Sequence, residues 1–209
     1  MMGLLFPRKC VLCRRILRRE EIDLCGACRG DVEPYASGKR KYQFLDSMTA
    51  VWYYEENVRR CIVRYKFYGA RHLAKNFGRQ LAMRVLQEDL GYDLITWVPV
   101  SRWRKVRRGY DQVELLAKHT AKELGCRPVR CLKKIRNNRS QSTLRDAAQR
   151  RANVLGVYRI TDPEPVAGKK ILLLDDVLTT GATAGECARV LLTAGAKEVH
   201  CAVLAAARK

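Results

Sequence analysis

A buried strand that runs directly into two carboxylates and a small-residue loop constrains this chain more than any other feature. The strand is predicted at residues 171–174, four branched apolar residues in a row. Asp175 and Asp176 follow where we expect that strand to end, and Thr-Thr-Gly-Ala-Thr (179–183) then leads into a helix expected over 183–192. Backbone N–H groups in such a loop and the dipole of the helix both favour a bound anion. The segment therefore predicts a phosphate site.

The two carboxylates point to a second kind of ligand group, because they would repel the phosphate. Carboxylates accept hydrogen bonds from sugar hydroxyls, or hold a metal ion between protein and ligand. A buried strand capped by an Asx turn is the plain alternative. A Walker B strand of an ATPase would also need a Gly-x4-Gly-Lys-Ser/Thr loop. The Gly-Lys pairs at Gly38 and Gly168 are followed by Arg or Lys, so the ATPase interpretation fails. A phosphate site beside a polyol site indicates a sugar phosphate.

The same segment resembles the phosphoribosyl diphosphate (PRPP) signature of the type I phosphoribosyltransferases, which is a hydrophobic strand, two acids and Thr-Thr-Gly-x-Thr. The resemblance implies that Asp175 and Asp176 are catalytic and hold the ribose hydroxyls, with Mg2+ bridging the diphosphate and those hydroxyls. It also implies that the loop cradles the 5′-phosphate. The loop residues are Thr179, Thr180, Gly181, Ala182 and Thr183.

Four cysteines near the N-terminus have the spacing of a metal site. Cys10, Cys13, Cys25 and Cys28 form two Cys-x2-Cys pairs, which can complete a tetrahedral sulfur site for zinc. Disulfides, a redox dithiol and an iron–sulfur cluster are the alternatives. The nine cysteines are odd in number and residues 1–10 do not read as a secretory leader, so we expect a cytoplasmic protein in which such pairs bind metal. A closed four-thiolate site is structural. The remaining cysteines are expected to be small buried apolar residues, namely Cys61, Cys126, Cys131, Cys187 and Cys201.

The chain is strongly basic, with 41 Lys and Arg against 21 Asp and Glu and a net charge of +20. Such a charge attracts polyanions. Basic residues cluster at 101–110, where Trp103 and Tyr110 are interleaved, and again at 127–151. Interleaved cations and aromatics suit single-stranded nucleic acid. A solvated surface and a diphosphate ligand are the alternatives. No apolar run approaches the length of a membrane span.

The hydrophobic pattern predicts an α/β fold, a parallel sheet flanked by helices. Strands are expected at 47–54, 94–100, 129–134, 154–160 and 198–207, besides 171–174, and helices at 58–88 (with a break at 65–69) and 113–124. Ligands in such folds lie beyond the carboxyl ends of the strands. Residues 31–42 read as a linker. We therefore predict a zinc-binding knuckle and linker at 1–42 and a phosphoribosyltransferase-like domain at 43–209.

Chain order, compared with the type I phosphoribosyltransferases, implies roles for two further loops. Residues 101–112 take the place of the diphosphate loop, with Arg107, Arg108 and Gly109 as the implied ligand contacts, and glycine allows close backbone approach. Residues 136–153 take the place of the flexible catalytic loop, in which Arg139 would neutralise the departing diphosphate. This segment also holds Gln141, Arg145 and Arg151. A plain linker is the alternative for 136–153.

Taken together, the chain is similar nearly end to end to the ComF (ComFC-like) family, in which a zinc knuckle precedes a phosphoribosyltransferase domain. Further matches are Tyr-Lys-Phe-x-Gly at 65–69, Val-Pro-Val at 98–100 and Arg-x3-Arg-Gly-Tyr-Asp-Gln at 104–112, where the family more often has Phe-Asn. The resemblance implies a PRPP-binding protein of bacterial competence (natural transformation) that contacts single-stranded DNA. It also implies helicase-like or recombination-mediator partners.

The alternative is an active phosphoribosyltransferase that acts on an unknown nitrogen base without a nucleic-acid role. The three histidines give this alternative no support, because they are single and dispersed. No catalytic role is assigned to His72, His119 or His200.

Overall fold

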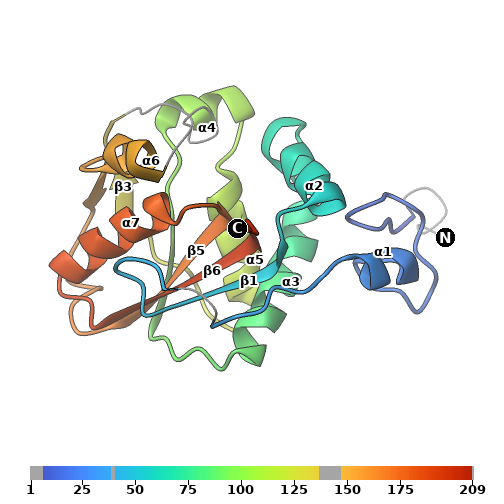
Figure 1. Ribbon diagram of the computed structural model, residues 1–209, viewed down its shortest axis with the longest axis horizontal. Coiled ribbons are helices and arrows are strands. Elements are labelled where there is room, and N and C mark those ends of the chain that lie inside the picture. The colour runs from blue at the N-terminus through green and yellow to red at the C-terminus, as the bar shows by residue number, and fades with distance from the viewer. Residues whose placement is uncertain (1–6, 39–40, 137–146, 209) are drawn as a thin grey trace.

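The computed structural model describes residues 7–38, 41–136 and 147–208 (Figure 1). The predicted catalytic Arg139 lies outside the described residues, together with Gln141 and Arg145. The side chain of Arg151 is not described either. Within the described residues, no helix is long and apolar enough to cross a membrane.

The centre of the fold is a parallel sheet in the strand order β1-β6-β5-β2. The strands are β1 (Ser47–Tyr53), β2 (Leu94–Trp97), β5 (Lys170–Leu178) and β6 (Glu198–Ala206). The register pairs Ile171 with Val199 and Leu178 with Ala206, so β5 and β6 are matched along nearly their whole length. The predicted α/β class, a parallel sheet flanked by helices, is confirmed.

Helices cover both faces of this sheet because its strands are apolar on both sides. Leu172 and Leu174 of β5 belong to one buried core, and Ile171 and Leu173 belong to the other. Successive strand residues point to opposite faces, which produces this division. The first core packs under α2 (Glu56–Phe67), α3 (Leu73–Gln87) and α5 (Gln112–Glu123), and the second packs under α7 (Ala182–Thr193) (Figure 1).

The strand β5 is longer than the sequence predicted, and this changes the position of the acidic pair. We expected the strand to end at residue 174, but β6 offers nine residues and keeps β5 paired as far as Leu178. Asp175 and Asp176 are therefore consecutive residues inside a strand, not residues of a loop after it. Conversely, β2 ends at Trp97, earlier than the predicted 94–100.

Two predicted segments of the chain have a different structure. Residues 102–108, expected as loop, form the helix α4 (Arg102–Arg108), because Ser101 caps its first turn and Gly109 ends it with a φ of 74°. The predicted strands at 129–134 and 154–160 shorten to β3 (Leu132–Lys134) and β4 (Tyr158–Ile160). These two pair antiparallel in a sheet of their own, and residue 154 belongs to α6 (Ala147–Val154).

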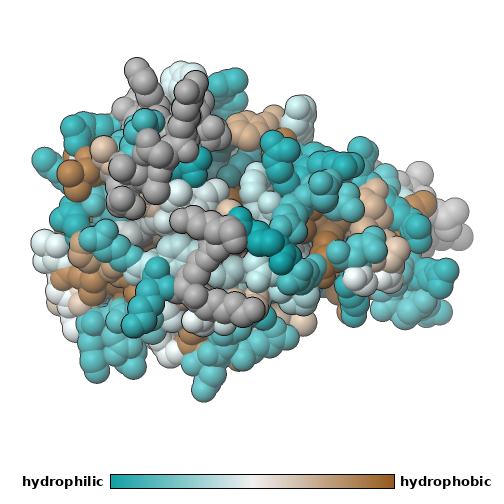
Figure 2. All heavy atoms as spheres, in the orientation of Figure 1, coloured by the Kyte–Doolittle hydropathy of each residue, from teal (hydrophilic) through white to brown (hydrophobic). Residues whose placement is uncertain are grey.

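The N-terminal segment, with α1 (Gly26–Asp31), projects from one side of the molecule and packs against α2 and α3 (Figure 1). Within residues 31–42, which were predicted as a linker, Tyr35 is buried and its N–H donates to the carbonyl of Val51. Figure 2 shows hydrophilic residues over most of the face in view.

Candidate functional site

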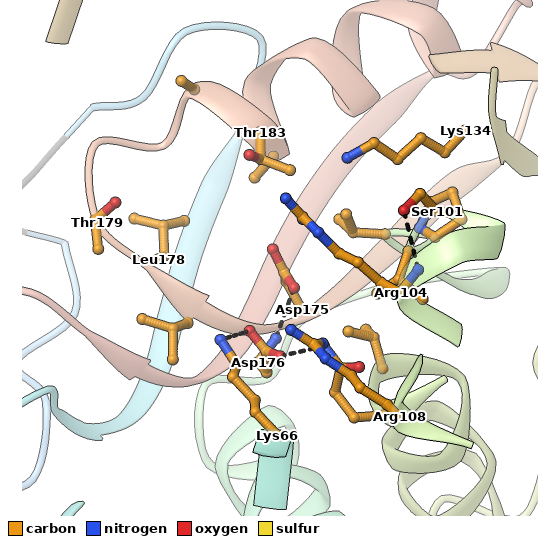
Figure 3. Close-up of a pocket in the computed structure, with 18 of the residues that line it drawn as sticks. Lys66, Ser101, Arg104, Arg108, Lys134, Asp175, Asp176, Leu178, Thr179 and Thr183 are labelled. Carbon is orange, nitrogen blue, oxygen red and sulfur yellow. Dashed lines mark hydrogen bonds and ion pairs between the residues drawn. The ribbon is translucent and has the colours of Figure 1, made fainter. Parts of the chain in front are cut away.

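A cavity of about 890 Å3 opens at the carboxyl ends of β2 and β5 (Figure 3). Its lining comes from residues 98–101 after β2, from 175–184 across the end of β5 and the start of α7, and from α2, α4 and α5. This is the edge of the sheet at which ligands of parallel α/β folds bind. The cavity therefore brings the PRPP-like signature and the predicted diphosphate segment to one place.

The two carboxylates of the signature both line the cavity, but they face different groups. Asp176 lies 2.7 Å from the ammonium of Lys66 and accepts a hydrogen bond from the side-chain amide of Gln112 at 3.0 Å. Asp175 accepts from the N–H of Asp176 at 2.8 Å and points toward Thr183 (Figure 3). This divergence follows from the strand, in which neighbouring side chains alternate between faces.

Burial changes the acidity of Asp175. Desolvation, followed by the adjacent charge of Asp176, raises the pKa of the Asp175 carboxyl to about 8. Asp175 is therefore largely protonated near neutral pH, and it can donate a hydrogen bond as well as accept one. The two acids are thus chemically distinct: one is an ion pair with Lys66 and the other is a protonatable group.

Positive charge dominates the rest of the lining. Among the described residues, six basic side chains line the cavity together with the two acids: Lys66, Arg104, Arg107, Arg108, Lys134 and Arg150. Burial, and then the charge of Arg104, lowers the pKa of Lys134 to about 8. Figure 3 shows Arg104 and Lys134 both directed toward the start of α7 near Thr183. Such a lining suits a ligand with several phosphate oxygens.

The predicted 5′-phosphate loop, residues 179–183, lies in the lining at the start of α7. Gly181 is the N-cap of α7 with a φ of 79°, and its carbonyl accepts the N–H of Gly185 at 2.7 Å. A side chain at Gly181 would meet the ring of Tyr42 at 2.4 Å. The amides at a helix N-terminus point along its axis and attract anions. The loop has the backbone that the phosphate prediction requires.

The three residues predicted to hold the diphosphate have separate positions. Arg107 and Arg108 line the cavity from α4, and Arg108 stacks over the ring of Phe67 at 4.7 Å. Gly109 lies outside the lining, where it ends α4 and its carbonyl accepts from Arg71 at 2.9 Å. Its positive φ of 74° ends the helix.

Two neighbours of Gly109 differ from expectation. Tyr110, predicted to stack under bases, is buried and donates its hydroxyl hydrogen to the carbonyl of Tyr65. Asp111, where the family more often has Asn, caps α5 by accepting from the N–H groups of Val113 and Glu114, both at 3.0 Å.

Four cavity residues carry chemistry that the sequence did not assign: Lys66, Arg104, Gln112 and Lys134. Lys66 and Lys134 are ordinary lysines in sequence, one in a polar helix and one in a short strand. The signal that pointed to Lys66 and Gln112 was their place in the segments 65–69 and 104–112 that match the family. Only the packing of α2, α5 and β5 shows which group each one meets.

The four N-terminal cysteines converge as predicted. Their Sγ atoms all lie within 4.8 Å of one another, and those of Cys13 and Cys25 are 3.6 Å apart. A tetrahedral zinc with Zn–S bonds of about 2.3 Å separates its sulfurs by about 3.8 Å. The donor set and the spacing therefore fit zinc. Of the other cysteines, four are buried as expected, whereas Cys126 is exposed.

Comparison with known proteins agrees with both parts of the chain. Residues 1–40 match the double zinc ribbon domain, and residues 114–209 match the phosphoribosyl transferase domain. The DNA utilization protein YhgH of Salmonella typhi is 30% identical over 91% of this chain and 87% of its own length. The chain belongs to the ComF family. Competence protein F of Haemophilus influenzae, another ComF relative, is 25% identical over 93% of this chain and 95% of its own.

Two further matches cover less of the chain. Competence protein ComFC of Streptococcus pneumoniae is 33% identical over 73% of this chain and 65% of that protein. Among solved structures, the glutamine PRPP amidotransferase of B. subtilis matches at 22% identity with a TM-score of 0.46, over 68% of this chain and 30% of that one. A TM-score of 0.46 is too low to support any conclusion about the activity of this chain. The zinc ribbon match and the cysteine cluster support a structural zinc in this ComF protein.

Proposed function

We propose that this ComF protein binds PRPP in the cavity between α2, α4, β5 and α7, and that it acts in bacterial competence. The observation that supports this proposal is the combination of two carboxylates, a phosphate loop at a helix N-terminus and six basic side chains around one cavity of about 890 Å3. In this assignment Asp175 and Asp176 face the ribose hydroxyls and residues 179–183 take the 5′-phosphate. Arg107 and Arg108 take the diphosphate.

The place of Mg2+ in this site follows from the donors around it. Carboxylate oxygens are the ligands that Mg2+ prefers. However, both oxygens of Asp176 already meet protein donors, one from Lys66 and one from Gln112. The acidic pair alone does not fit the ion. Mg2+ therefore belongs to the proposal only as an ion carried by PRPP, and not as an ion held by the acidic pair.

The competence role and the DNA contact are supported by relatives and by charge. The relatives are named competence proteins and DNA utilization proteins. The helix α4 presents Trp103 at 57% exposure, with Arg107 over its ring at 5.2 Å, on the rim of the cavity. Exposed aromatic and basic side chains suit single-stranded DNA. We place this role in the cytoplasm, beside helicase-like or recombination-mediator partners.

A second candidate is turnover, the transfer of the phosphoribosyl group from PRPP to a nitrogen base. This candidate is favoured by Lys134, which lines the cavity and whose pKa is lowered to about 8 by burial. An amine whose pKa is lowered toward neutral pH has a larger neutral fraction than an ordinary lysine, and that fraction can accept the proton that a nitrogen nucleophile loses. Release of diphosphate from PRPP in the presence of a panel of bases tests this alternative, with Lys134→Met as the variant that should abolish it.

Thermal unfolding with and without Mg-PRPP tests the binding proposal. A ligand at about a hundred times its Kd stabilises a fold by about 2.7 kcal/mol, so wild type should show a clear rise in Tm. Asp175→Asn/Asp176→Asn should lose this rise. Asp162→Asn/Glu164→Gln is the matched control, since it removes two exposed acids outside the cavity and should keep it. No rise in wild type would refute PRPP binding.

The DNA contact needs a separate measurement. Single-stranded DNA affinity should fall steeply with salt, because cations on the protein release counterions from the phosphates. Trp103→Ala should weaken binding by about 1–3 kcal/mol if a base stacks on that ring. An affinity that does not depend on salt would contradict the assignment of DNA to the basic surface.

A further inference from the structure

One lysine is already bound to the acidic pair. Lys66 lies in the last turn of α2, and its Nζ is 2.7 Å from Oδ1 of Asp176. Both side chains are largely buried, with 19% and 6% exposed. Figure 3 shows the ammonium reaching the end of β5 from below the cavity, where Arg108 also approaches.

The surroundings of Asp176 hold it in this arrangement. Its second oxygen accepts from Nε2 of Gln112 at 3.0 Å, and Gln112 itself is 3% exposed. The other amide atom of that residue, Oε1, is buried without a hydrogen-bond partner in the described part of the chain, while the residue lines the cavity. A buried acceptor without a partner is costly unless a ligand donor meets it. Each oxygen of Asp176 thus already has one protein donor, and the buried acceptor without a partner belongs to Gln112.

Charge balance in the cavity does not require a divalent ion. The six basic side chains of the lining outnumber the two acids, and Asp175 is largely neutral. A phosphomonoester carries about −1.5 to −2 charges at pH 7, so a sugar with several phosphates is strongly anionic. The excess of fixed cations can offset much of that charge. The usual reason for a metal, which is to screen acids and phosphates from each other, is met by Lys66 and the arginines.

We propose that Lys66 takes the place of a divalent cation in this site: its ammonium neutralises Asp176, so that the sugar diphosphate binds without a metal ion. This inference rests on the proposed function, because it concerns how the same ligand is held.

The experiment compares PRPP affinity by calorimetry in excess EDTA and in excess MgCl2, for wild type, Lys66→Met, Lys66→Arg and Lys105→Met. Lys105 is a suitable control because it pairs with Glu114 and does not line the cavity. Wild type and Lys105→Met should bind in EDTA within about tenfold of their affinity in Mg2+. The PRPP affinity of Lys66→Met in EDTA should be at least about thirtyfold lower than that of wild type, which corresponds to the lower end of the cost of breaking a buried charge pair. Mg2+ should restore part of this affinity. Lys66→Arg keeps a cation and should bind in EDTA.

A second measurement uses the metal alone. Mg2+ without PRPP should raise the Tm of Lys66→Met, because an unpaired Asp176 becomes available to it, and should leave wild type unchanged.

The possible failures are distinguishable. Wild type that binds PRPP in neither condition refutes the proposed function itself. Wild type that binds only with Mg2+, or Lys66→Met that binds in EDTA as wild type does, overturns the role of Lys66 and leaves PRPP binding intact. The wild-type comparison needs no variant, so it decides the question even if Lys66→Met does not fold.

Discussion

Replacing Asp175 by Asn should remove a pH dependence of stability that this one buried carboxyl creates. Its pKa is raised to about 8 by burial and by the charge of Asp176, whereas an unfolded Asp titrates near 3.9. Between those values the folded protein holds a proton that the unfolded chain has released. The free energy of unfolding therefore falls as pH rises, by about 1.4 kcal/mol per pH unit, or about 4 kcal/mol from pH 5 to pH 8.

Urea denaturation at a series of pH values between about pH 5 and pH 8 measures this effect. The free energy of unfolding of wild type minus that of Asp175→Asn should fall with pH at the stated slope. The reason is that the Asn amide fills the same space as the carboxyl but does not titrate. Asp162→Asn, which removes an exposed carboxyl, should show the same dependence of unfolding free energy on pH as wild type. If Asp175→Asn also runs parallel to wild type, Asp175 is ionised in the folded protein and the protonated-acid interpretation of the site is wrong.

Three backbone-related predictions concern stability. Gly78→Ala should lower the unfolding free energy by about 1–3 kcal/mol, because the new Cβ would lie 2.5 Å from the Cβ of His119, where α3 packs against α5. Gly91→Ala is the control, since a Cβ there has open space around it. Gly181→Ala should lower the unfolding free energy by at least about 1–2 kcal/mol, because its φ of 79° is unfavourable for a residue with a Cβ, and it should weaken PRPP binding. Gly168→Ala, also at a positive φ, should lose similar stability but bind PRPP normally. Asp111→Ala should cost about 0.5–2 kcal/mol through its lost cap, and Asp111→Ser should restore most of it. Denaturation midpoints and PRPP titration check all three, and costs near zero would contradict them.

The sequence predicted those parts of the fold whose signal is local. The apolar run 171–174, the helix after it and the cysteine spacing each depend on a few neighbouring residues, and each is present in the structure. The end of β5 was missed because it depends on β6, 20 residues further on, which keeps pairing as far as Leu178. For the same reason the sequence could not show that Asp175 and Asp176 point to different neighbours.

The helix α4 was missed for a different reason. Residues 102–108 hold five basic residues and none of them is buried, so no apolar periodicity marks a helix. Its ends were readable, since Ser101 is a good N-cap and Gly109 a typical helix end. Lys66 and Gln112 could not be assigned to the acidic pair because their partner lies on β5, more than 60 residues away in the chain.

The zinc ribbon and the ligand cavity are connected through α2, and this gives a last prediction. The loop between Cys10 and Cys13 offers its carbonyls to α2: Val11 accepts from Cys61 Sγ and from Arg64 Nη2, both at 2.7 Å. Two residues after Arg64, the same helix carries Lys66 to Asp176. Through this helix, a change at the zinc can reach the ligand cavity.

Losing the zinc should therefore weaken PRPP binding although the metal does no chemistry. Cys13→Ser/Cys28→Ser should lower the Tm and reduce PRPP affinity at least about tenfold, since a displaced α2 forfeits part of a charge-pair contact. Cys126→Ser, at an exposed cysteine outside the cluster, is the matched control. Arg64→Met should lower PRPP affinity while the zinc is retained, because it removes the hydrogen bond from α2 to the carbonyl of Val11. A zinc-free protein that binds PRPP as tightly as wild type would show that α2 holds Lys66 in place without the ribbon.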